Sequence, residues 1–470
     1  MAVMESVKAG LLVTTLSILI ALYYKKSSDQ ELRSHLETIL SNLLRAEKKY
    51  RLVKPKQVIV GIGACSDAFV EATEFLDKLN ISAPIGSMGH PDSIMSPDDL
   101  GEIFAFFFTQ GAASERYVAN RTFWDMALET TKTMEARWVL GGNAPVIAKR
   151  LVAEGLKDVT LGAYLSKPLF EDLSEKMNIV GQVVEVDDVH IILEYERDSR
   201  WQHLTAPRAN RFIIHADVHN LKMSALKDIE NHIQTEKPHA FVLGGLQMLD
   251  STVMNKDERS KSINRLSALL SSLNDETLRH FELASFAEKD FFREVIDKIV
   301  PHADSLGMNE QELMNLYTML EDNSVTLVSN AHPRIALVLD QMRSIWKVLS
   351  PGKLSRLHVH TLAFQAIMTK KNKWSNTMIA AAKASLTAYR HTCSSGEIDL
   401  ESARLLMDES FAVGRKEGSQ RIKFNAEKPV ACWEEGNALI CVSPVLICTN
   451  VKQTAGGGDN ISAAGLAMQL

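Results

Sequence analysis

Thr454-Ala455-Gly456-Gly457-Gly458-Asp459-Asn460-Ile461-Ser462-Ala463-Ala464-Gly465 predicts a glycine-rich turn that runs into a helix, directly after a buried strand at Val445–Cys448. Glycines let backbone N–H groups crowd around an anion without interference from a Cβ atom. The start of the following helix adds partial positive charge at the same place. An aspartate there is a base beside an anion site, an arrangement suited to phosphoryl transfer. The alternative is a tight turn with an N-cap aspartate.

The composition is that of an ordinary globular protein. The chain has 470 residues, of which 46% are hydrophobic and 23% charged. This length allows a large core and more than one domain. The net charge of −6 gives no support for a nucleic-acid partner.

The N-terminus carries an apolar run at residues 9–24, with Lys8 before it and Lys25 and Lys26 after it. The run is slightly shorter than the ~20 residues that span a bilayer, and it suits a secretory signal or a short signal anchor. It shows no clear Ala-x-Ala cleavage site, so an uncleaved membrane anchor stays open, as does a buried core helix. We expect a signal or anchor segment at 1–26, a linker helix at 27–50 and the body at 51–470.

Five cysteines are too few for a disulfide scaffold, and none has the spacing of a zinc site. Cys432 and Cys441 flank a predicted hairpin turn at residues 434–437. In an oxidising compartment they are the first candidates for a disulfide. The alternative, two small buried hydrophobic residues, stays open.

Apolar strands alternate with helices through most of the body. Strands are predicted at 57–61, 137–140, 159–163, 240–245, 280–284 and 325–328, and helices at 145–155, 256–274, 286–299, 309–321 and 375–389. This alternation predicts an α/β fold, doubly wound, with a mostly parallel sheet covered by helices on both faces. Ligands of such sheets bind outside the carboxyl ends of the strands.

Two segments, at about 84–130 and 178–216, depart from the alternation. The second is rich in residues that alternate at period two, as in a half-exposed antiparallel sheet. We expect both to form a smaller β-rich lid domain inserted into the main one. A lid that excludes water suits phosphoryl transfer, because hydrolysis is the side reaction.

Three acidic positions are candidates for chemistry: Glu282 at a strand end, Glu312 at a helix start and Asp459 in the glycine turn. Carboxylates are hard oxygen ligands suited to Mg²⁺, which keeps several waters and bridges phosphates. Glu282 and Glu312 could hold the ion through water. For Glu312, a helix cap at residues 309–312 is the alternative.

Several motifs, in this order, resemble the ADP-dependent glucokinases of the ribokinase-like superfamily, and most of all their metazoan-type members. They are Gly61-Ile62-Gly63-Ala64-Cys65-Ser66-Asp67, Gly141-Gly142-Asn143-Ala144, Arg208-Ala209-Asn210-Arg211-Phe212-Ile213, His280-Phe281-Glu282, Asn309-Glu310-Gln311-Glu312 and Gly456-Gly457-Gly458-Asp459. The resemblance covers about residues 50–470. It implies transfer of the β-phosphate of ADP to the 6-hydroxyl of glucose, with Mg²⁺, in a monomer located at the endoplasmic reticulum.

The resemblance also implies roles for individual residues. Asp459 is the general base, and the backbone of Gly456, Gly457 and Gly458 forms the anion hole. Glu282, Glu312 and Asp459 organise Mg²⁺. The remaining roles are sugar binding by Asp67, Glu115, Gly142, Asn143 and His190, and phosphate binding by Arg208 or Arg211.

One departure from the family pattern is Gly63, which stands where relatives commonly have asparagine, so one sugar hydrogen bond is absent or supplied elsewhere. The chain also leaves only a short helix after Asp459. Neither departure removes a catalytic group.

Two alternatives of function stay open. One is a kinase of the same fold that uses ATP or another sugar; residues 61–69 and 141–148 contain no lysine or arginine, which favours an unphosphorylated sugar. The other is a membrane-tethered scaffold without activity, against which the three intact carboxylates argue.

Three sequons, at Asn80, Asn120 and Asn460, are acceptors for N-glycosylation. A glycan at Asn460 would block the site beside Asp459. We therefore expect Asn460 to be unmodified, either because the body faces the cytosol or because the C-terminus folds before it can be modified.

Overall fold

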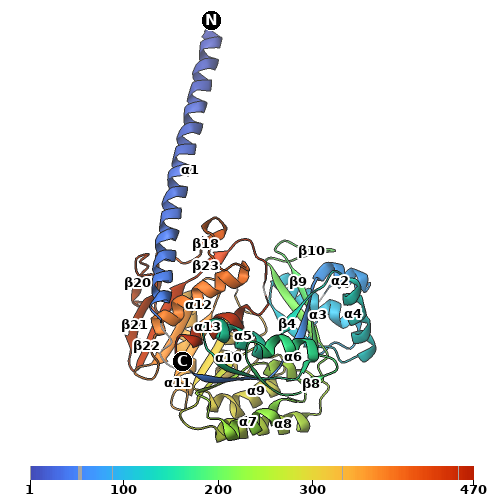
Figure 1. The fold of residues 1–470 in the computed structure, drawn as a ribbon. Coiled ribbons are helices and arrows are strands. Elements are labelled where there is room, and N and C mark those ends of the chain that lie inside the picture. The colour runs from blue at the N-terminus through green and yellow to red at the C-terminus, as the bar shows by residue number, and fades with distance from the viewer. Residues whose placement is uncertain (1, 51–55, 87, 331, 454) are drawn as a thin grey trace.

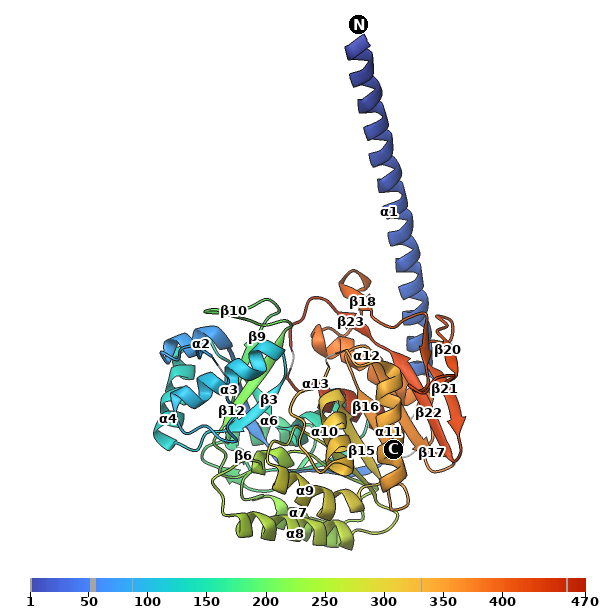
Figure 2. The same ribbon diagram turned by 180° about the vertical axis from the view of Figure 1, so that it is seen from behind.

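The computed structural model describes residues 2–50, 56–86, 88–330, 332–453 and 455–470, and the side chains of residues 2–13 and 28 are not described. Figures 1 and 2 show a larger and a smaller lobe side by side, with a long helix projecting from the larger one. Each lobe contains one main sheet.

The larger lobe is built on a ten-stranded sheet with the order β21-β22-β17-β16-β15-β14-β13-β1-β5-β7. The strands from β16 to β7 are parallel, while β17, β22 and β21 pair antiparallel at one end. In sheet order their bounds are Ala431–Glu435, Ala438–Pro444, Phe364–Lys370, Arg356–His360, Ser305–Asn309, Leu278–Glu282, Ala240–Leu243, Gln57–Gly61, Asp158–Gly162 and Asn178–Val180.

Alternate residues of the central strands enter two different cores, because both faces of the sheet are covered. In β1, Ile59 packs into one core, whereas Val58 and Val60 pack into the other. The first face is covered by α7 (Leu226–Thr235), α8 (Lys256–Ser272), α9 (Lys289–Lys298), α10 (Glu310–Glu321) and α11 (Ile335–Leu349), and the second by α5 (Asn143–Ala153), α12 (Thr377–Thr392) and α13 (Gly457–Ala467). The prediction of a doubly wound α/β fold is confirmed.

The smaller lobe is a five-stranded sheet with the order β3-β12-β9-β2-β4 and its own core. The strands are β3 (Ser114–Tyr117), β12 (Asn210–His215), β9 (Val189–Tyr195), β2 (Cys65–Glu71) and β4 (Arg137–Gly141), and the helices are α2 (Ala72–Lys78), α3 (Pro97–Gln110) and α4 (Arg121–Thr133). The expected insertions at about 84–130 and 178–216 contain β3, β9 and β12, while β2 and β4 lie outside them, and the start of the second one, β7, belongs to the sheet of the larger lobe instead.

Shorter elements complete the chain. They are β6 (Leu165–Ser166), α6 (Lys167–Ser174), β8 (Val183–Val184), β10 (Arg200–Trp201), β11 (Leu204–Thr205), the 3₁₀ turns Leu246–Leu249, Val300–His302 and Leu400–Ser402, β18 (Ala403–Leu405), β19 (Ser410–Ala412), β20 (Arg421–Lys423) and β23 (Leu446–Cys448).

Two strand predictions need correction. The apolar run 137–140 was expected in the main parallel sheet, but β4 pairs antiparallel with β2 at the edge of the smaller sheet. Residues 325–328 form no strand. The side chains of Leu327 and Val328 instead pack against the core of the smaller lobe. This packing buries the apolar run without any pairing to a neighbouring strand.

The N-terminal helix α1 runs without a break from Ala2 to Lys48. Residues 14–27 are exposed, whereas Leu36, Ile39 and Leu43 are buried against the body at helical spacing. The signal or anchor segment and the linker helix, expected at 1–26 and 27–50, therefore lie on one helix. Within the described residues, no helix meets the length and hydropathy needed to cross a bilayer.

Two disulfides are present. Cys432 and Cys441 face each other across β21 and β22 and are bonded, as the hairpin predicts. Cys393–Cys448, which the sequence did not predict, joins the residue after α12 to β23. Cys65 is free and buried.

Candidate active site

A cavity of about 700 Å³ is lined by residues of both sheets. It lies at the carboxyl ends of the central parallel strands, where Glu282, Asn309 and His360 stand. It contains every site residue expected from the sequence: Asp67, Glu115, Gly142, Asn143, His190, Arg208, Arg211, Glu282, Glu312, Gly456, Gly457, Gly458 and Asp459. Residues far apart in the chain thus form one site.

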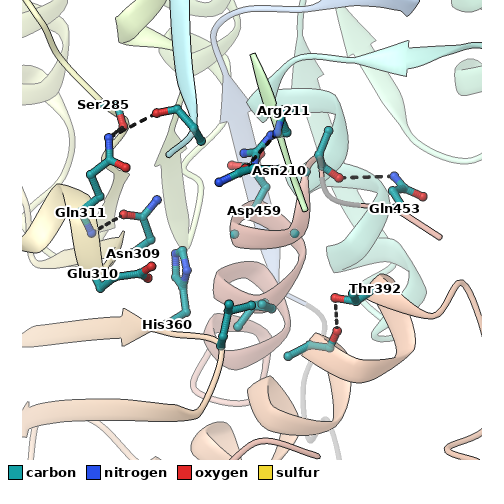
Figure 3. Close-up of a pocket in the computed structure, with 18 of the residues that line it drawn as sticks. Asn210, Arg211, Ser285, Asn309, Glu310, Gln311, His360, Thr392, Gln453 and Asp459 are labelled. Carbon is teal, nitrogen blue, oxygen red and sulfur yellow. Dashed lines mark hydrogen bonds between the residues drawn. The ribbon is translucent and has the colours of Figure 1, made fainter. Parts of the chain in front are cut away.

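The glycine turn caps the start of α13. Gly456 is the N-cap residue with a φ of 68°, a left-handed conformation that glycine adopts freely. Gly457, Gly458 and Asp459 form the first turn of the helix, whose N–H groups have no partner within the helix. Figure 3 shows Asp459 at this turn, facing Arg211 and Asn210. The turn therefore offers N–H groups and a helix N-terminus to an anion.

Asp459 is fixed by a hydrogen bond from Asn143 Nδ2 to its Oδ1 of 2.9 Å. Asn143 is in turn held by Gln247, whose Nε2 donates to Asn143 Oδ1 at 2.7 Å. Burial, together with the nearby charge of Glu282, raises the pKa of Asp459 to about 7. A carboxylate with a pKa near neutrality is well matched to a role as general base.

Glu282 is buried between two histidines at the end of β14. Its two oxygens lie 3.1 Å from the Nε2 atoms of His280 and His360. Although burial opposes ionisation, these two hydrogen bonds hold the pKa of Glu282 well below its usual range. A side chain at Gly307 on the next strand would overlap with this carboxylate. Glu282 is thus a fixed negative charge.

Glu312 forms the expected cap at the start of α10. Its oxygens accept from Asn309 N and Asn309 Nδ2, both at 2.8 Å, while Asn309 Oδ1 accepts from Glu312 N at 2.9 Å. Burial raises the pKa of Glu312 to about 8, and the charges of Glu282 and Asp459 add to this effect. The cap is therefore real, and it also places a carboxyl group in the cavity.

The donor set around Glu282 and Glu312 suits Mg²⁺ held through water. The groups are hard oxygen donors. The oxygens of both side chains already accept hydrogen bonds, which disfavours direct ligation by either. Glu282, Glu312 and Asp459 lie close together, and burial and mutual repulsion raise the pKa of Glu312 and of Asp459. A bound cation would offset this repulsion between the carboxylates.

The smaller sheet contributes a second set of polar groups, beginning with Asp67. Its carboxylate occupies the space that a Cβ at Gly141 would need on the neighbouring strand. Cys65 Sγ donates to Asp67 Oδ1 at 3.2 Å. Burial raises the pKa of Asp67 to about 6, against the opposing charge of His190.

His190 and His215, paired across β9 and β12, share one buried carboxylate. Asp217 lies 3.1 Å from His190 Nε2 and 3.2 Å from His215 Nδ1. Burial opposes the charged form of His190, but Asp217 outweighs it and raises the pKa of His190 to about 10. The other ring nitrogens, His190 Nδ1 and His215 Nε2, each lie 3.7 Å from Oε1 of Glu115. This cluster presents a charged imidazole and a carboxylate to the cavity.

The two candidate arginines differ in how far their guanidinium groups are engaged. Arg208 Nε donates to Gly111 O at 2.5 Å, in the space that a Cβ at Gly111 would take. Arg211 makes a 3.3 Å bond to Asn210 Oδ1, and its buried Nε has no partner in the described structure. The charge of Arg211 also acts to lower the pKa of Asp459. Arg211 is therefore the better placed of the two for a phosphate.

Sequence reasoning missed Gln247, His360 and the group of Asp217 and His215. Gln247 follows the strand-ending pair Gly244-Gly245, and His360 ends β16. Their places at strand ends are the signals that could have revealed them. Asp217 and His215 lie behind His190, and no pattern in the sequence indicates that contact.

Comparison with known proteins places the chain in a family. A sequence profile described as ADP-specific Phosphofructokinase/Glucokinase conserved region matches residues 56–468. An ADP-dependent glucokinase of Bos taurus is 32% identical, over 87% of this chain and 84% of its own length. A probable ADP-dependent glucokinase of Caenorhabditis elegans is 26% identical, over 97% of this chain and 93% of its own.

Solved structures agree on the fold. An ADP-dependent kinase in complex with fructose-6-phosphate and ADPβS superposes with a TM-score of 0.66 at 18% identity, covering 92% of this chain and 97% of that one. A protein from Pyrococcus horikoshii described as a hypothetical ADP-dependent phosphofructokinase gives a TM-score of 0.59 at 16% identity, covering 89% of this chain and 98% of that one. With a profile match over nearly the whole body, this chain belongs to the family of ADP-specific phosphofructokinases and glucokinases.

Proposed function

We propose that this protein is an ADP-dependent glucokinase, which transfers the β-phosphate of ADP to the 6-hydroxyl of glucose and yields glucose 6-phosphate and AMP. The observation that carries the proposal is that the glycine turn and Asp459 share one cavity with Asp67, Glu115 and His190. One side offers an anion site with a base, and the other offers polar groups suited to sugar hydroxyls. The bovine relative supports the choice of glucose.

Each group of cavity residues has its own role in the proposed phosphoryl transfer. Asn143 orients the carboxylate of Asp459, which accepts the proton of the 6-hydroxyl. The N–H groups of Gly457 and Gly458 stabilise the charge of the migrating phosphoryl group, and Arg211 adds positive charge. Glu282 and Glu312 would hold Mg²⁺ through water, and the ion when bound neutralises charge on the phosphates of ADP.

The part of the cavity that is lined by the smaller sheet suits an unphosphorylated sugar better than a sugar phosphate. Asp67 and Glu115 are acidic and would repel a phosphate group. Residues 61–69 and 141–148, which include the sugar loops, contain no lysine or arginine. This favours glucose over fructose 6-phosphate, the ligand named for the similar solved kinase.

The test is product formation by the purified full chain with Mg²⁺, with ADP or ATP as donor and glucose or fructose 6-phosphate as acceptor. We expect glucose 6-phosphate with ADP alone. Turnover with ATP, or with fructose 6-phosphate in place of glucose, would contradict the proposal. A folded protein inactive with every pair would favour the scaffold alternative.

We further propose that the protein acts at the endoplasmic reticulum as a monomer, directed by the segment at 1–26, which also contacts the membrane if it is not cleaved. The two disulfides support an oxidising compartment. Separately, we expect Asn460 to be unmodified, since both ends of its side-chain amide are engaged in the folded protein. Glycopeptide mass spectrometry of active enzyme that shows full occupancy at Asn460 would contradict this expectation about Asn460.

A further inference from the structure

The side chain of Asn460, next to the proposed base, bonds within the protein and does not line the cavity. It is not among the described residues that line the cavity, although Asp459 and Ile461 on either side are. Its Nδ2 donates to the carbonyl oxygen of Gly456 at 2.8 Å, and its Oδ1 accepts from Arg150 Nε at 2.9 Å. The side chain thus joins Arg150 to the residue whose left-handed conformation starts the phosphate-binding turn.

We propose that Arg150 is a positioning residue for the phosphate-binding turn, acting through Asn460 on Gly456. This inference rests on the proposed function. It assigns a role in the reaction to a side chain outside the cavity. The side-chain amide of Asn460 is the only group between Arg150 and Gly456 in this contact. A substitution at Arg150 therefore changes the support of the turn, although Arg150 itself lies outside the cavity.

Helix α5 holds the turn at two points. Its first residue, Asn143, bonds Asp459, and Arg150 in its last turn bonds Asn460. Seven residues separate the two (150 − 143), about two helical turns, so both side chains leave the same face of the helix. The neighbouring face of α5, about 40° to 80° round from Asn143, is anchored by the buried residues Ile147 and Leu151. The helix is therefore a firm support for the orientation of consecutive residues of α13.

A chain of ion pairs fixes Arg150 from behind. Its Nη1 lies 3.4 Å from Glu154, Glu154 lies 2.6 Å from Lys383, and Lys383 lies 2.7 Å from Glu47 in the last turn of α1. The side chain of Glu154 is 6% exposed and that of Lys383 is 12% exposed. Because breaking a shielded pair leaves an uncompensated charge, each member constrains the next. The guanidinium fork suits Arg150 to this place, since it donates toward Asn460 and Glu154 together.

The experiment compares Arg150→Ala, Asn460→Ala and the double variant in the full chain, with Arg343→Ala as matched control. Arg343 is similarly exposed, at 29% against 24% for Arg150, and like Arg150 it does not line the cavity. It bonds Glu435 through two nitrogens at 2.8 Å and Asp340 at 2.9 Å, and neither partner belongs to the glycine turn. Initial rates give kcat and the KM for glucose, and calorimetry gives the Kd for ADP with Mg²⁺. Thermal unfolding reports stability separately.

We expect Arg150→Ala and Asn460→Ala each to lower kcat by about tenfold to one-hundredfold, the effect of a small displacement of catalytic groups. The Kd for ADP rises, and the KM for glucose changes less than twofold. The double variant loses no more than either single one, because both act on the same contact. Arg343→Ala lowers the melting temperature without changing kcat or the Kd for ADP. Arg150→Lys keeps the charge and one donor nitrogen, so it recovers part of the lost kcat. It also replaces Arg150→Ala in the comparison if that variant fails to fold.

Wild-type kcat and ADP affinity in the Arg150 variants, or losses that add in the double variant, would overturn the inference. Calorimetry separates it from the proposed function, because ADP binding needs no turnover. If the wild type binds ADP but forms no product, the proposed function fails, while weaker ADP binding in the Arg150 variant than in the Arg343 variant still supports the positioning role. Absence of ADP binding by the wild type would overturn both.

Discussion

Three carboxyl groups of the cavity have been given different properties by their surroundings. Two histidines keep Glu282 ionised, whereas burial raises the pKa of Glu312 to about 8 and that of Asp459 to about 7. Groups whose environments separate their pKa values commonly divide acid, base and charge roles between them. Asp459 alone among these three lies in the first turn of α13, so it is the group available for a proton transfer there.

Replacing Asp459 by asparagine tests this role directly. The amide has nearly the same shape but cannot take the proton, so we expect Asp459→Asn to lower kcat by about 10²- to 10⁴-fold, the usual contribution of a general base. The fold and ADP binding are retained. Rates of glucose 6-phosphate formation, with calorimetry of ADP as control, measure this; a variant with wild-type kcat would place the base elsewhere.

The pair of His190 and Asp217 predicts a dependence of stability on pH. The pKa of His190 is raised to about 10 from an ordinary value near 6.5, so its contribution is complete below about pH 6.5 and is lost as the pH rises through about 10. Removing one partner of such a buried pair costs about 3 to 5 kcal/mol. Asp217→Asn should lower the free energy of unfolding by that order at pH 6 and flatten its decline toward pH 10.

Urea unfolding of both proteins at pH 6, 8 and 9.5 gives these free energies. Equal slopes against pH in wild type and variant would mean that His190 is not charged in the folded protein. Asp217 does not line the cavity, so the variant leaves the cavity lining itself unchanged.

At the level of elements, the two disulfides close loops of very different length. Cys393–Cys448 spans 55 residues and Cys432–Cys441 only 9. Loop-closure entropy predicts stabilisation of about 4 kcal/mol for the longer loop and about 3 kcal/mol for the shorter one. The longer one also fixes the segment that leads to the glycine turn, where Lys452 N bonds Thr392 O at 2.8 Å.

We therefore expect the double variant Cys393→Ser/Cys448→Ser to be less stable than Cys432→Ser/Cys441→Ser, and to have a higher Kd for ADP. The second pair is the matched control, since it lies in a hairpin at the edge of the sheet. Melting temperatures and calorimetry provide the comparison. Equal effects of the two pairs on ADP binding would show that the longer disulfide has only a general role.

The parallel core could be predicted because its strands are local apolar runs, and the residues that the family motifs indicate do line one cavity. A strand such as Val58–Gly61 is apolar throughout, and the Gly456–Asp459 run combines residues that tolerate a left-handed turn with an acidic group at a helix start. The sequence did not predict that residues 137–140 join the smaller sheet, because pairing is decided by distant partners. Nor did it predict Cys393–Cys448 or the contact of Asp217 with two histidines, since each brings together side chains from separate elements.

For the whole molecule, the division of the site between two lobes implies closure. Asp67, Glu115 and His190 belong to the smaller sheet, and the glycine turn belongs to the larger lobe. Each lobe has its own core, so the lobes can move as units. A sugar and a nucleotide bound together would contact both and favour the closed arrangement.

Small-angle X-ray scattering with glucose and the unreactive donor ADPβS should therefore show a smaller radius of gyration than the free protein. Glucose alone and ADPβS alone are the controls, each expected to give a smaller change than the pair. A radius unchanged by the pair would mean that the lobes are already closed without ligands.

The unbroken helix α1 sets an orientation as well as a distance. Before Leu36, the first buried residue among the side chains that the structure describes, the helix extends roughly 50 Å at 1.5 Å per residue, and each residue adds a rotation of about 100° around the helix axis. One residue inserted into the exposed stretch 14–27 would lift the body by only ~1.5 Å and yet swing it through more than a quarter of a circle about the stalk. If another structure binds the N-terminus, the number of residues in the exposed part of α1 therefore sets the rotational orientation of the cavity relative to that structure.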